Sequence, residues 1–299
     1  MNSSPSPYQI KAFTYVARER SFSRAAQYLN VTQSSVTQHV AKLENHMGTL
    51  LFIRRREGLE LTRAGSELFK ITDRLATLDQ LVTEKINDYS ALTDGNIRLI
   101  ANAPRPAMPI IARYGELYPQ VQIDFTLYDW TTSMTLLNER QVDMAIVTEP
   151  QDNPALVTHE LRWSKYMAYM RADHRLANNP VLSLVDLQAE TLVLPEDGSL
   201  TQRVVRSKIR KHGLNFPRIL KTTTFPMVKE ALLHGLGVGL LLENSLFPSE
   251  NLVAVPVREM FEDYRDCVVI PRDKKDLRLI KSFLGVCIDA VVSELNQPV

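Results

Sequence analysis

The sequence predicts a protein of mixed α+β and α/β class, with a small helical head, one long helix and a two-lobed α/β domain. Three observations lead to this prediction. Two short amphipathic segments meet at a break between Ser21 and Leu43. Apolar residues then recur at steps of three and four from Leu68 to Ile86. From Asn96 onward, apolar strand-like runs alternate with helical patterns, and 299 residues are enough for two domains.

The head is organised around the break. Its first segment runs from Ser23, the expected N-cap, to Leu29, and the small residues Ala25 and Ala26 allow a close helix contact. The second segment restarts at Thr32 or Gln33. Its apolar face consists of Val36, Val40 and Leu43. With a covering helix over 8–18 and a stop at Gly48, this pattern predicts a helix-turn-helix. The alternative is an ordinary solvated helical hairpin.

The other face of the second helix is polar. It presents Gln33, Ser34, Ser35, Thr37, Gln38 and His39. Hydroxyl and amide groups at the start of an exposed helix can hydrogen-bond base edges and phosphates in a major groove. This face therefore predicts contact with double-stranded DNA, to which we add the neighbouring polar and basic residues Ser23, Arg24, Thr32 and Lys42.

A basic hairpin is expected next. Two apolar arms, Leu50–Ile53 and Leu59–Leu61, flank a charged turn that contains Arg54, Arg55 and Arg56. A hairpin after a helix-turn-helix forms a wing, whose arginines would reach the DNA backbone or an adjacent minor groove. A merely solvated turn is the alternative.

Charge is distributed unevenly. Residues 1–63 contain nine Lys and Arg against four acidic residues, a net charge of +5, which leaves −4 for the rest of a chain whose total is +1. A basic head on a mildly acidic body is typical of a polyanion-binding module joined to a second domain of different function. Two cysteines, no signal-peptide pattern and no apolar run near 18 residues predict a cytoplasmic protein that does not enter a membrane.

A long helix from Thr62 to about Leu92 should join the two parts. Its stripe is close to a heptad seam. The stripe consists of Leu68, Ile71, Leu75, Leu78, Leu81 or Val82, and Ile86. One exposed helix cannot bury such a stripe, so pairing with a second copy is the simplest solution, and it would place two heads on a DNA dyad. The expected domains are 1–65, 66–93 and 94–299, with residues 93–95 as the linker.

The remaining chain predicts an α/β domain. Strands are expected at 97–103, 121–129, 142–149, 165–171, 191–198, 219–224, 253–257 and 266–273. Helices are expected at 104–119, 131–141, 199–213, 225–237 and 277–295. This order implies parallel sheets, with ligands at the carboxyl ends of strands. Crossings near 163 and 266 divide the domain into lobe I, about 96–163 and 266–299, and lobe II, about 164–265.

Candidate ligand-binding residues lie at the expected helix starts and at the ends of the strands that precede them. They are Asn102, Arg105, Thr131, Thr132, Ser199, Thr201, Arg203, Thr223, Thr224 and Phe225. The alternative for each hydroxyl is a helix cap, which is the more frequent role of Ser and Thr at a helix start. Arg105 and Arg203 are more informative. A cation beside a helix N-terminus adds positive charge where the helix dipole is already positive, which is unfavourable unless an anion binds there. A surface salt bridge is the alternative. The sequence thus predicts a small anion, a carboxylate or phosphonate, as ligand.

Residues 8–65 resemble the DNA-binding head of LysR-type transcriptional regulators, and the resemblance continues over nearly the whole length. The run SFSRAAQYLNVTQSSVTQHVAKLE is followed by LFIRR and LTRAG in the family's order and spacing. The resemblance implies a winged helix-turn-helix, a dimerising linker helix, commonly a tetramer, and an effector domain similar to periplasmic binding proteins. It also implies contact with RNA polymerase, and EDGSLTQR resembles regulators linked to phosphonate use.

This chain departs from the family pattern in its recognition helix. Ser34 and Ser35 stand where the family usually has Pro-Ala or Pro-Ser, and Gln38 stands where it often has Arg. Gln suits adenine and Arg suits guanine, so the departure bears on base preference.

Other classes of function have less support. The six histidines include no ligand-spaced pair, and GLGVG at 235–239 lacks the context of a dinucleotide loop, so no catalytic residue, cofactor or metal is predicted. A cytoplasmic small-molecule-binding protein without a regulatory role would explain residues 96–299 but not the basic head. A redox-sensing regulator would use Cys267 and Cys287, although their expected positions in a strand and on an apolar helix face favour buried thiols.

Overall fold

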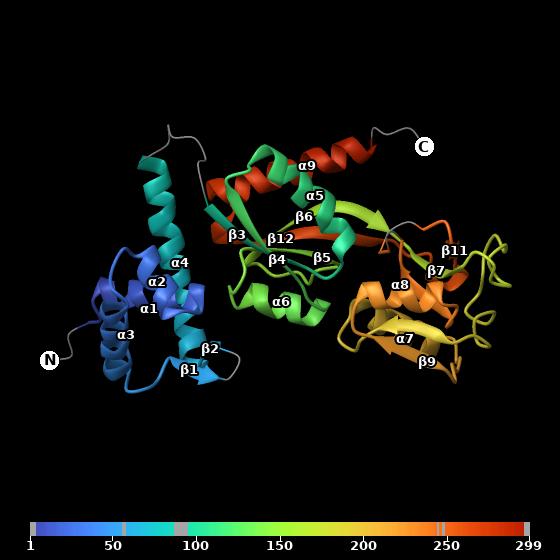
Figure 1. Ribbon diagram of the computed structural model, residues 1–299, viewed down its shortest axis with the longest axis horizontal. Coiled ribbons are helices and arrows are strands. Elements are labelled where there is room, and N and C mark those ends of the chain that lie inside the picture. The colour runs from blue at the N-terminus through green and yellow to red at the C-terminus, as the bar shows by residue number, and fades with distance from the viewer. Residues whose placement is uncertain (1–3, 56–57, 87–94, 244, 247–248, 296–299) are drawn as a thin grey trace. The chain divides into compact units, whose positions relative to one another are not determined.

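The computed structural model describes residues 4–55, 58–86, 95–243, 245–246 and 249–295 (Figure 1). Residues 1–91 with 138–141 form one compact unit, and residues 92–137 with 142–299 form a second. None of the described helices is long and apolar enough to span a membrane.

The head contains the predicted helix-turn-helix and wing. Its elements are α1 (Pro7–Glu19), α2 (Phe22–Tyr28), α3 (Gln33–Met47), β1 (Phe52–Arg55), β2 (Gly58–Leu61) and the long helix α4 (Arg63–Ile86). Apolar side chains from all of these elements meet in one core, in which Phe13, Val40, Leu51 and Phe69 are almost fully buried. The head therefore has a hydrophobic core of its own.

The helix boundaries follow local capping. Thr32 caps α3, with its Oγ1 accepting from the Ser35 amide at 3.2 Å, and α3 ends at Gly48 with φ 66°, as predicted. The predicted N-cap Ser23 is wrong. Ser21 caps α2 instead, accepting from the Arg24 amide at 3.3 Å, because Ser21 has the extended backbone that a cap requires while Ser23 is already helical.

The wing pairs further toward its tip than predicted. Phe52 lies opposite Leu61 and Arg55 lies opposite Gly58, so Arg54 and Arg55 belong to strand β1 and not to the turn. The ladder continues past the apolar arms because backbone groups, not side chains, form its hydrogen bonds. Arg56 and residues 87–94, which include the end of the predicted long helix and most of the linker, lie outside the described residues. Gly95 is already part of the next strand.

Two contacts fix α4 to the head. A Cβ placed on Gly65 would lie 2.1 Å from the Leu51 carbonyl oxygen, so only glycine permits this approach. The neighbouring Thr62 hydroxyl donates to the Leu50 carbonyl at 2.8 Å and accepts from the Gly65 amide at 2.9 Å. Further along α4, the buried Asp73 carboxylate accepts from Arg18 Nε of α1 at 2.6 Å.

The other face of α4 is apolar and exposed. Ile71, Leu75, Leu78, Val82 and Ile86 are each more than half exposed, whereas Leu68 packs against the head core. The exposed residues recur at steps of three and four, so they form one continuous stripe of α4.

Lobe I is a five-stranded sheet in the order β4-β3-β5-β12-β6. Its strands are β3 (Gly95–Ala101), β4 (Val121–Leu127), β5 (Met144–Thr148), β6 (Leu156–Ser164) and β12 (Tyr264–Pro271). Helices α5 (Pro104–Leu117) and α9 (Arg278–Leu295) lie against one face of the sheet, and α6 (Trp130–Asn138) lies against the other (Figure 1).

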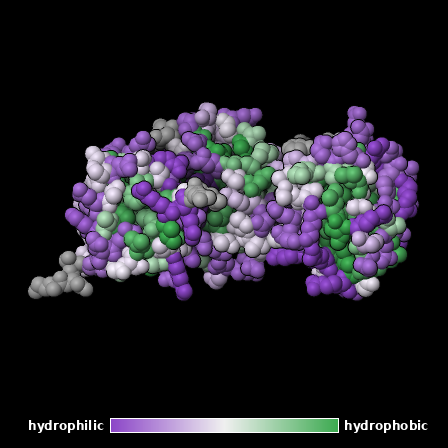
Figure 2. Space-filling view, turned by 60° about the horizontal axis from the view of Figure 1, so that its bottom comes forward, coloured by the Kyte–Doolittle hydropathy of each residue, from purple (hydrophilic) through white to green (hydrophobic). Residues whose placement is uncertain are grey.

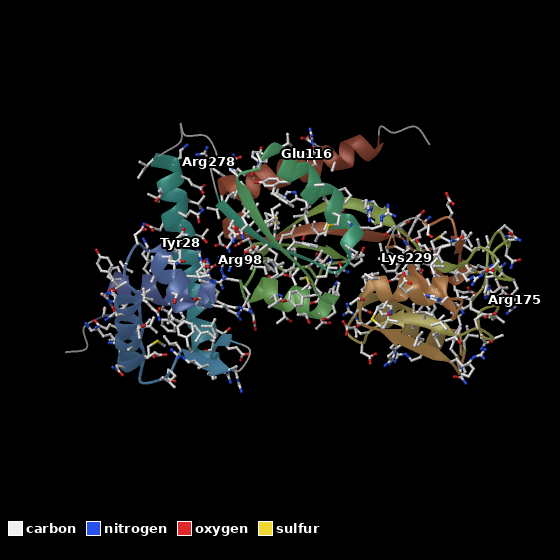
Figure 3. The ribbon with its side chains drawn as sticks, viewed as in Figure 1. Tyr28, Arg98, Glu116, Arg175, Lys229 and Arg278 are labelled. Carbon is white, nitrogen blue, oxygen red and sulfur yellow. The ribbon has the colours of Figure 1, made fainter. Side chains whose placement is uncertain are left out.

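A charge network joins three segments of lobe I, with the Lys274 side chain buried and those of Arg98 and Asp143 partly exposed. Arg98 of β3, labelled in Figure 3, places Nη2 2.9 Å from the Asp143 carboxylate, and Lys274 Nζ lies 2.8 Å from the same group. Burial alone would favour the neutral carboxyl, but the charges of Arg98 and Lys274 hold the pKa of Asp143 well below its usual value.

Lobe II is a second five-stranded sheet, in the order β11-β7-β10-β8-β9. Its strands are β7 (Tyr166–Arg171), β8 (Leu192–Pro195), β9 (Ile219–Thr222), β10 (Val238–Leu242) and β11 (Leu252–Pro256). Helices α7 (Leu200–Lys211) and α8 (Phe225–Leu233) pack on opposite faces. On the side seen in Figure 2, lobe II shows an apolar strip bordered by hydrophilic residues. Short 3-10 helices, Arg258–Met260 and Arg272–Lys274, flank β12.

The sheets differ from the prediction in two ways. Each is mixed, because β12 runs antiparallel to β5 and β6, and β7 runs antiparallel to β10 and β11. In addition, β6 was not predicted. It is an edge strand with one exposed side, so its apolar pattern is weak, and it pairs with β12 more than a hundred residues away.

The contact at Gly65 yields a stability prediction. We expect Gly65→Ala to lower the free energy of unfolding by about 1–3 kcal/mol, because the added methyl group would overlap the Leu51 carbonyl. Urea unfolding followed by circular dichroism measures this change. The matched control is Gly115→Ala, in the exposed part of α5, where nothing lies within 4 Å of the added Cβ. That substitution should stabilise the chain by roughly 0.5–1 kcal/mol, so equal effects of the two variants would contradict the close-contact explanation.

Candidate functional sites

The first candidate site is the polar face of α3. Gln33, Ser34, Thr37, Gln38 and Lys42 are all exposed. Ser23 Oγ donates to Gln33 Oε1 at 2.7 Å, and Thr32 Oγ1 lies 3.0 Å from Ser34 Oγ, so the helix start is ordered by its own side chains. Within the described residues, Gln38 and Lys42 have neither a hydrogen bond nor an ion pair. Their donors and acceptors are therefore available to a partner.

The basic residues around this face are exposed as well. Arg24 turns back toward α1, where it donates to the Glu19 carbonyl. On the wing, Arg55 Nε lies 3.3 Å from Glu60 Oε2 across the hairpin, with both side chains more than half exposed. Arg54 is exposed on the same strand. An exposed ion pair of this kind is weak, so it does not prevent Arg55 from contacting a phosphate.

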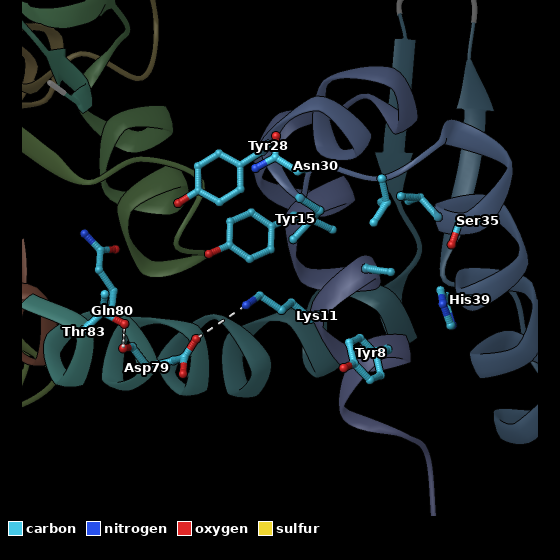
Figure 4. Close-up of a pocket in the computed structure, with 14 residues that line it drawn as sticks. Tyr8, Lys11, Tyr15, Tyr28, Asn30, Ser35, His39, Asp79, Gln80 and Thr83 are labelled. Atoms are coloured by element: carbon cyan, nitrogen blue, oxygen red, sulfur yellow. Dashed lines mark hydrogen bonds and ion pairs between the residues drawn. The ribbon is translucent and has the colours of Figure 1, made fainter.

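Ser35 and His39 are half-buried, whereas Gln38 is exposed. Both half-buried residues line a cavity of about 450 Å³ bounded by α1, the turn after α2, α3 and α4 (Figure 4). The His39 ring stacks on Tyr8, with 6.2 Å between centroids, and Lys11 Nζ lies 3.7 Å from Asp79 Oδ2 across the cavity. The sequence prediction placed His39 in or near the major groove together with Gln38. In the structure, one helical step turns the His39 ring about 100° from Gln38, toward Tyr8 of α1.

The second candidate site lies where the two lobes meet. In lobe I, Asn102 Oδ1 accepts from the Thr148 amide at 3.3 Å, which anchors the end of β3 to β5. Asp129 caps α6 by accepting from the Thr131 and Thr132 amides at 2.8 and 3.1 Å, and also from the Thr132 hydroxyl. A carboxylate of the chain itself thus occupies the N-terminus of α6, which removes it as an anion site.

In lobe II, the predicted hydroxyls act partly as caps. Ser199 caps α7 by accepting from the Gln202 amide at 3.1 Å, and Thr224 caps α8 by accepting from the Met227 amide at 3.4 Å. Thr223 contacts the Met227 sulfur and Phe225 begins α8. Thr201 is buried and accepts from the Tyr166 hydroxyl at 3.3 Å. Burial raises the pKa of Tyr166, so this hydroxyl stays protonated.

Both candidate arginines contact the opposite lobe. Arg105 of α5 donates from Nη1 to the Leu246 carbonyl at 2.9 Å. Arg203 of α7 places its guanidinium carbon 4.0 Å from the centroid of the Trp130 ring. Thr131 Oγ1 also donates to the Gly198 carbonyl at 3.1 Å. The structure therefore brings Arg105, Thr131 and Arg203 to the boundary between lobes.

Three residues near the candidate positions were missed by the sequence prediction. Trp130 and Tyr166 appear in the sequence only as apolar positions, and nothing local indicates their cross-lobe or buried polar contacts. Thr222, at the carboxyl end of β9, has a buried hydroxyl without a hydrogen-bond partner among the described residues. Its place directly before Thr223 is the one signal that could have identified it. No group of three or more potential metal ligands occurs among the residues that the structure describes.

Both cysteines are buried. Cys267 is 0% exposed in β12 and Cys287 is 1% exposed in α9. Burial raises the pKa of each thiol to about 12, so both remain protonated at neutral pH. Since the thiolate is the form that reacts with oxidants, this environment disfavours a redox pair.

A winged helix-turn-helix joined to a two-lobed α/β domain defines the class of DNA-binding transcriptional regulators. Residues 7–66 match the bacterial regulatory helix-turn-helix protein of the lysR family, and residues 91–291 match the LysR substrate binding domain. The chain belongs to the LysR family of transcriptional regulators.

Individual relatives agree with this assignment. The RuBisCO operon transcriptional regulator of Allochromatium vinosum is 25% identical over 90% of each chain. The regulator CbbR of Rhodospirillum rubrum is 28% identical over 90% of this chain and 91% of its own. A full-length OxyR structure from Pseudomonas aeruginosa superimposes with a TM-score of 0.78 at 18% identity, covering 94% of both chains. These relatives are regulators, and the OxyR structure confirms the fold.

The buried thiols yield a labelling prediction. We expect a thiol reagent at neutral pH to label native protein far more slowly than urea-unfolded protein, in which both cysteines become reactive. Rapid labelling of the native protein by a thiol reagent or hydrogen peroxide would restore the redox-sensing hypothesis.

The raised pKa of each thiol also predicts that the free energy of unfolding falls between about pH 9 and pH 12, because the thiols then ionise in the unfolded chain but not in the folded one.

Proposed function

We propose that this LysR-family regulator reads a dyad operator through α3 and binds a small anion between the lobes of its second domain. The observation that supports the DNA-reading part is the exposed face of α3. Gln38 and Lys42 project from it without partners among the described residues, on a head with a net charge of +5. An amide can make two hydrogen bonds to adenine, and an ammonium group can neutralise a phosphate.

In this proposal each basic or polar residue has a distinct task. Gln33, Ser34, Thr37 and Gln38 contact base edges, while Ser23, Arg24, Thr32 and Lys42 contact the flanking backbone. Arg54 and Arg55 on β1 contact the backbone or minor groove beside the recognition helix, together with the adjacent Arg56. Ser35 and His39 support α3 from the cavity side instead of reading bases.

The exposed stripe of α4 supports pairing with a second copy. Five apolar side chains from Ile71 to Ile86 face solvent on one side of a helix whose other side is committed to the head. The spacing of these residues is close to a heptad repeat, so the stripes of two copies could pack against each other and bury their apolar side chains. The resulting homodimer presents two heads to a dyad, and two dimers would form the tetramer that the family resemblance implies. A ligand that prefers one arrangement shifts the population, and with it the DNA bend and the contact with RNA polymerase.

The proposed effector is an anion such as a carboxylate or phosphonate. Arg203 supports it, because this cation lies near the start of α7 and has no carboxylate partner among the described residues. Arg105 adds a second positive charge at the boundary of the lobes. Thr222, Thr223 and Thr224 offer hydroxyls at the start of α8.

The DNA-reading proposal predicts different effects for two substitutions. With an operator selected from a random duplex pool, Gln38→Ala should weaken specific binding by about 1–3 kcal/mol and leave binding to random DNA unchanged. Arg55→Ala should weaken both equally and reduce the salt slope by about 1. Fluorescence anisotropy across a salt series measures both quantities, with His39→Ala as a control whose base preference should stay that of the wild type. Equal losses on operator and random DNA for Gln38→Ala would contradict base reading.

The anion proposal predicts ligand-induced stabilisation of the full-length protein. A carboxylate, phosphate or phosphonate present at 100 times its dissociation constant should add about 2.7 kcal/mol to the stability of the domain that binds it. A thermal-shift screen detects this change, and both Arg105→Ala and Arg203→Ala should reduce it. Arg210→Ala, on the exposed end of the same helix α7, is the charge-matched control. Stabilisation that survives both boundary substitutions would place the anion elsewhere, and no stabilisation by any anion would favour an uncharged effector.

A further inference from the structure

Trp130 is an aromatic ring of lobe I that meets an arginine of α7. Its indole is almost fully buried, and Nε1 donates to the Thr148 carbonyl at 2.7 Å, which fixes the orientation of the ring. The ring lies in the core between α6 and the lobe I sheet, and Leu200 of lobe II packs against this same apolar cluster. Arg203 therefore rests on a rigid surface that belongs to the opposite lobe.

The contact uses the face of the guanidinium and leaves its edge available. With 4.0 Å between the guanidinium carbon and the ring centroid, the two groups are in van der Waals contact. The five N–H donors of arginine lie in the guanidinium plane, so a face contact does not consume them. No acceptor for these donors occurs among the described residues.

The second tryptophan provides an internal comparison. Arg265 lies over the Trp163 ring at 5.9 Å, but its donors reach Glu149 at 3.4 Å and Glu160 at 3.1 Å. That arginine is neutralised by the chain's own carboxylates, and Trp163 is 56% exposed. Of these two Trp–Arg contacts, only the one at the lobe boundary leaves a cation without a carboxylate partner.

Short contacts beside the Trp130 ring hold the two lobes together at this point. Gly198, with φ 95°, presents its carbonyl to the Thr131 hydroxyl, and a Cβ on Gly198 would come within 3.1 Å of Asp129 Oδ1. Residues 198–203 of lobe II thus dock onto residues 129–131 of lobe I. The position of the Arg203 N–H edge depends on this docking. The affinity of an anion bound to that edge would therefore depend on the contact between the two lobes.

We propose that Trp130 is a positioning residue for the effector: its ring holds the Arg203 guanidinium by the face, so that the N–H edge receives two oxygens of a bound oxyanion. The inference rests on the proposed function, because it specifies how the anion is held. Carboxylates, phosphates and phosphonates share the two-oxygen geometry, to which arginine but not lysine is matched.

The test measures anion binding to the full-length protein by calorimetry, with inorganic phosphate, methylphosphonate and succinate as three separate probes. We expect at least one probe to bind the wild type. Arg203→Lys, which keeps the charge but loses the planar edge, and Trp130→Leu, which loses the ring, should each raise its dissociation constant about tenfold. Trp130→Phe, which keeps a smaller ring, should have a smaller effect. Trp163→Leu is the matched control and should bind as the wild type does.

A fluorescence readout covers the case in which Trp130→Leu fails to fold. In a Trp163→Phe background, Trp130 is the single tryptophan, and its emission should change saturably with the probe anion but not with chloride at equal ionic strength. Unchanged emission, or wild-type affinity in Trp130→Leu, would overturn the positioning role. If affinity falls in Arg203→Ala but not in Trp130→Leu, the proposed function stands and this inference fails. If no probe binds, both the anion assignment and this inference fail, while the DNA-reading proposal is untouched.

Discussion

The long helix α4 has two faces that both require cover, and this constraint governs the DNA-binding unit. One face carries Phe69 and Asp73 into the head, where Arg18 and the Leu51 carbonyl fix it. The opposite face exposes five apolar side chains. A helix with polar residues on that face could serve a solitary head, whereas the apolar stripe of this one is the surface for which a second copy is proposed as cover. The head contacts and the exposed apolar stripe thus lie on one and the same helix.

Local sequence signals predicted the head well because its contacts are mostly local. Thr32 and Gly48 mark the ends of α3 through hydrogen bonds to their near neighbours, and the apolar stripe of α3 faces the core as its spacing indicates. Ser23 shows the limit of such signals. Ser21 and Ser23 are both plausible caps, and the packing of Phe22 into the core, not the sequence near the serines, places the helix start one residue after Ser21.

The second domain was less predictable wherever partners are distant in sequence. Strand β6 exists because β12 pairs with it, and its own residues give only a weak alternation. At the lobe boundary, charge and helix position selected Arg105 and Arg203 as candidates, and the structure shows both in contact with the opposite lobe. Trp130 could not be selected, because its role appears only when α6 of one lobe meets α7 of the other. The capping of α6 by Asp129 also required coordinates, since the sequence alone does not reveal which carboxylate turns back onto the helix start.

The close packing of Gly65 on Leu51 has a consequence for operator architecture. Because α4 cannot tilt away from the wing without separating this contact, the head moves with the helix as one body. Sliding one α4 stripe along another by a single heptad would then displace the heads by about 10 Å, roughly three base pairs of duplex. In the proposed dimer, the half-site spacing that the protein binds best would therefore depend on the register in which the two helices pair. Comparing its affinity for operators of different half-site spacing would identify that register.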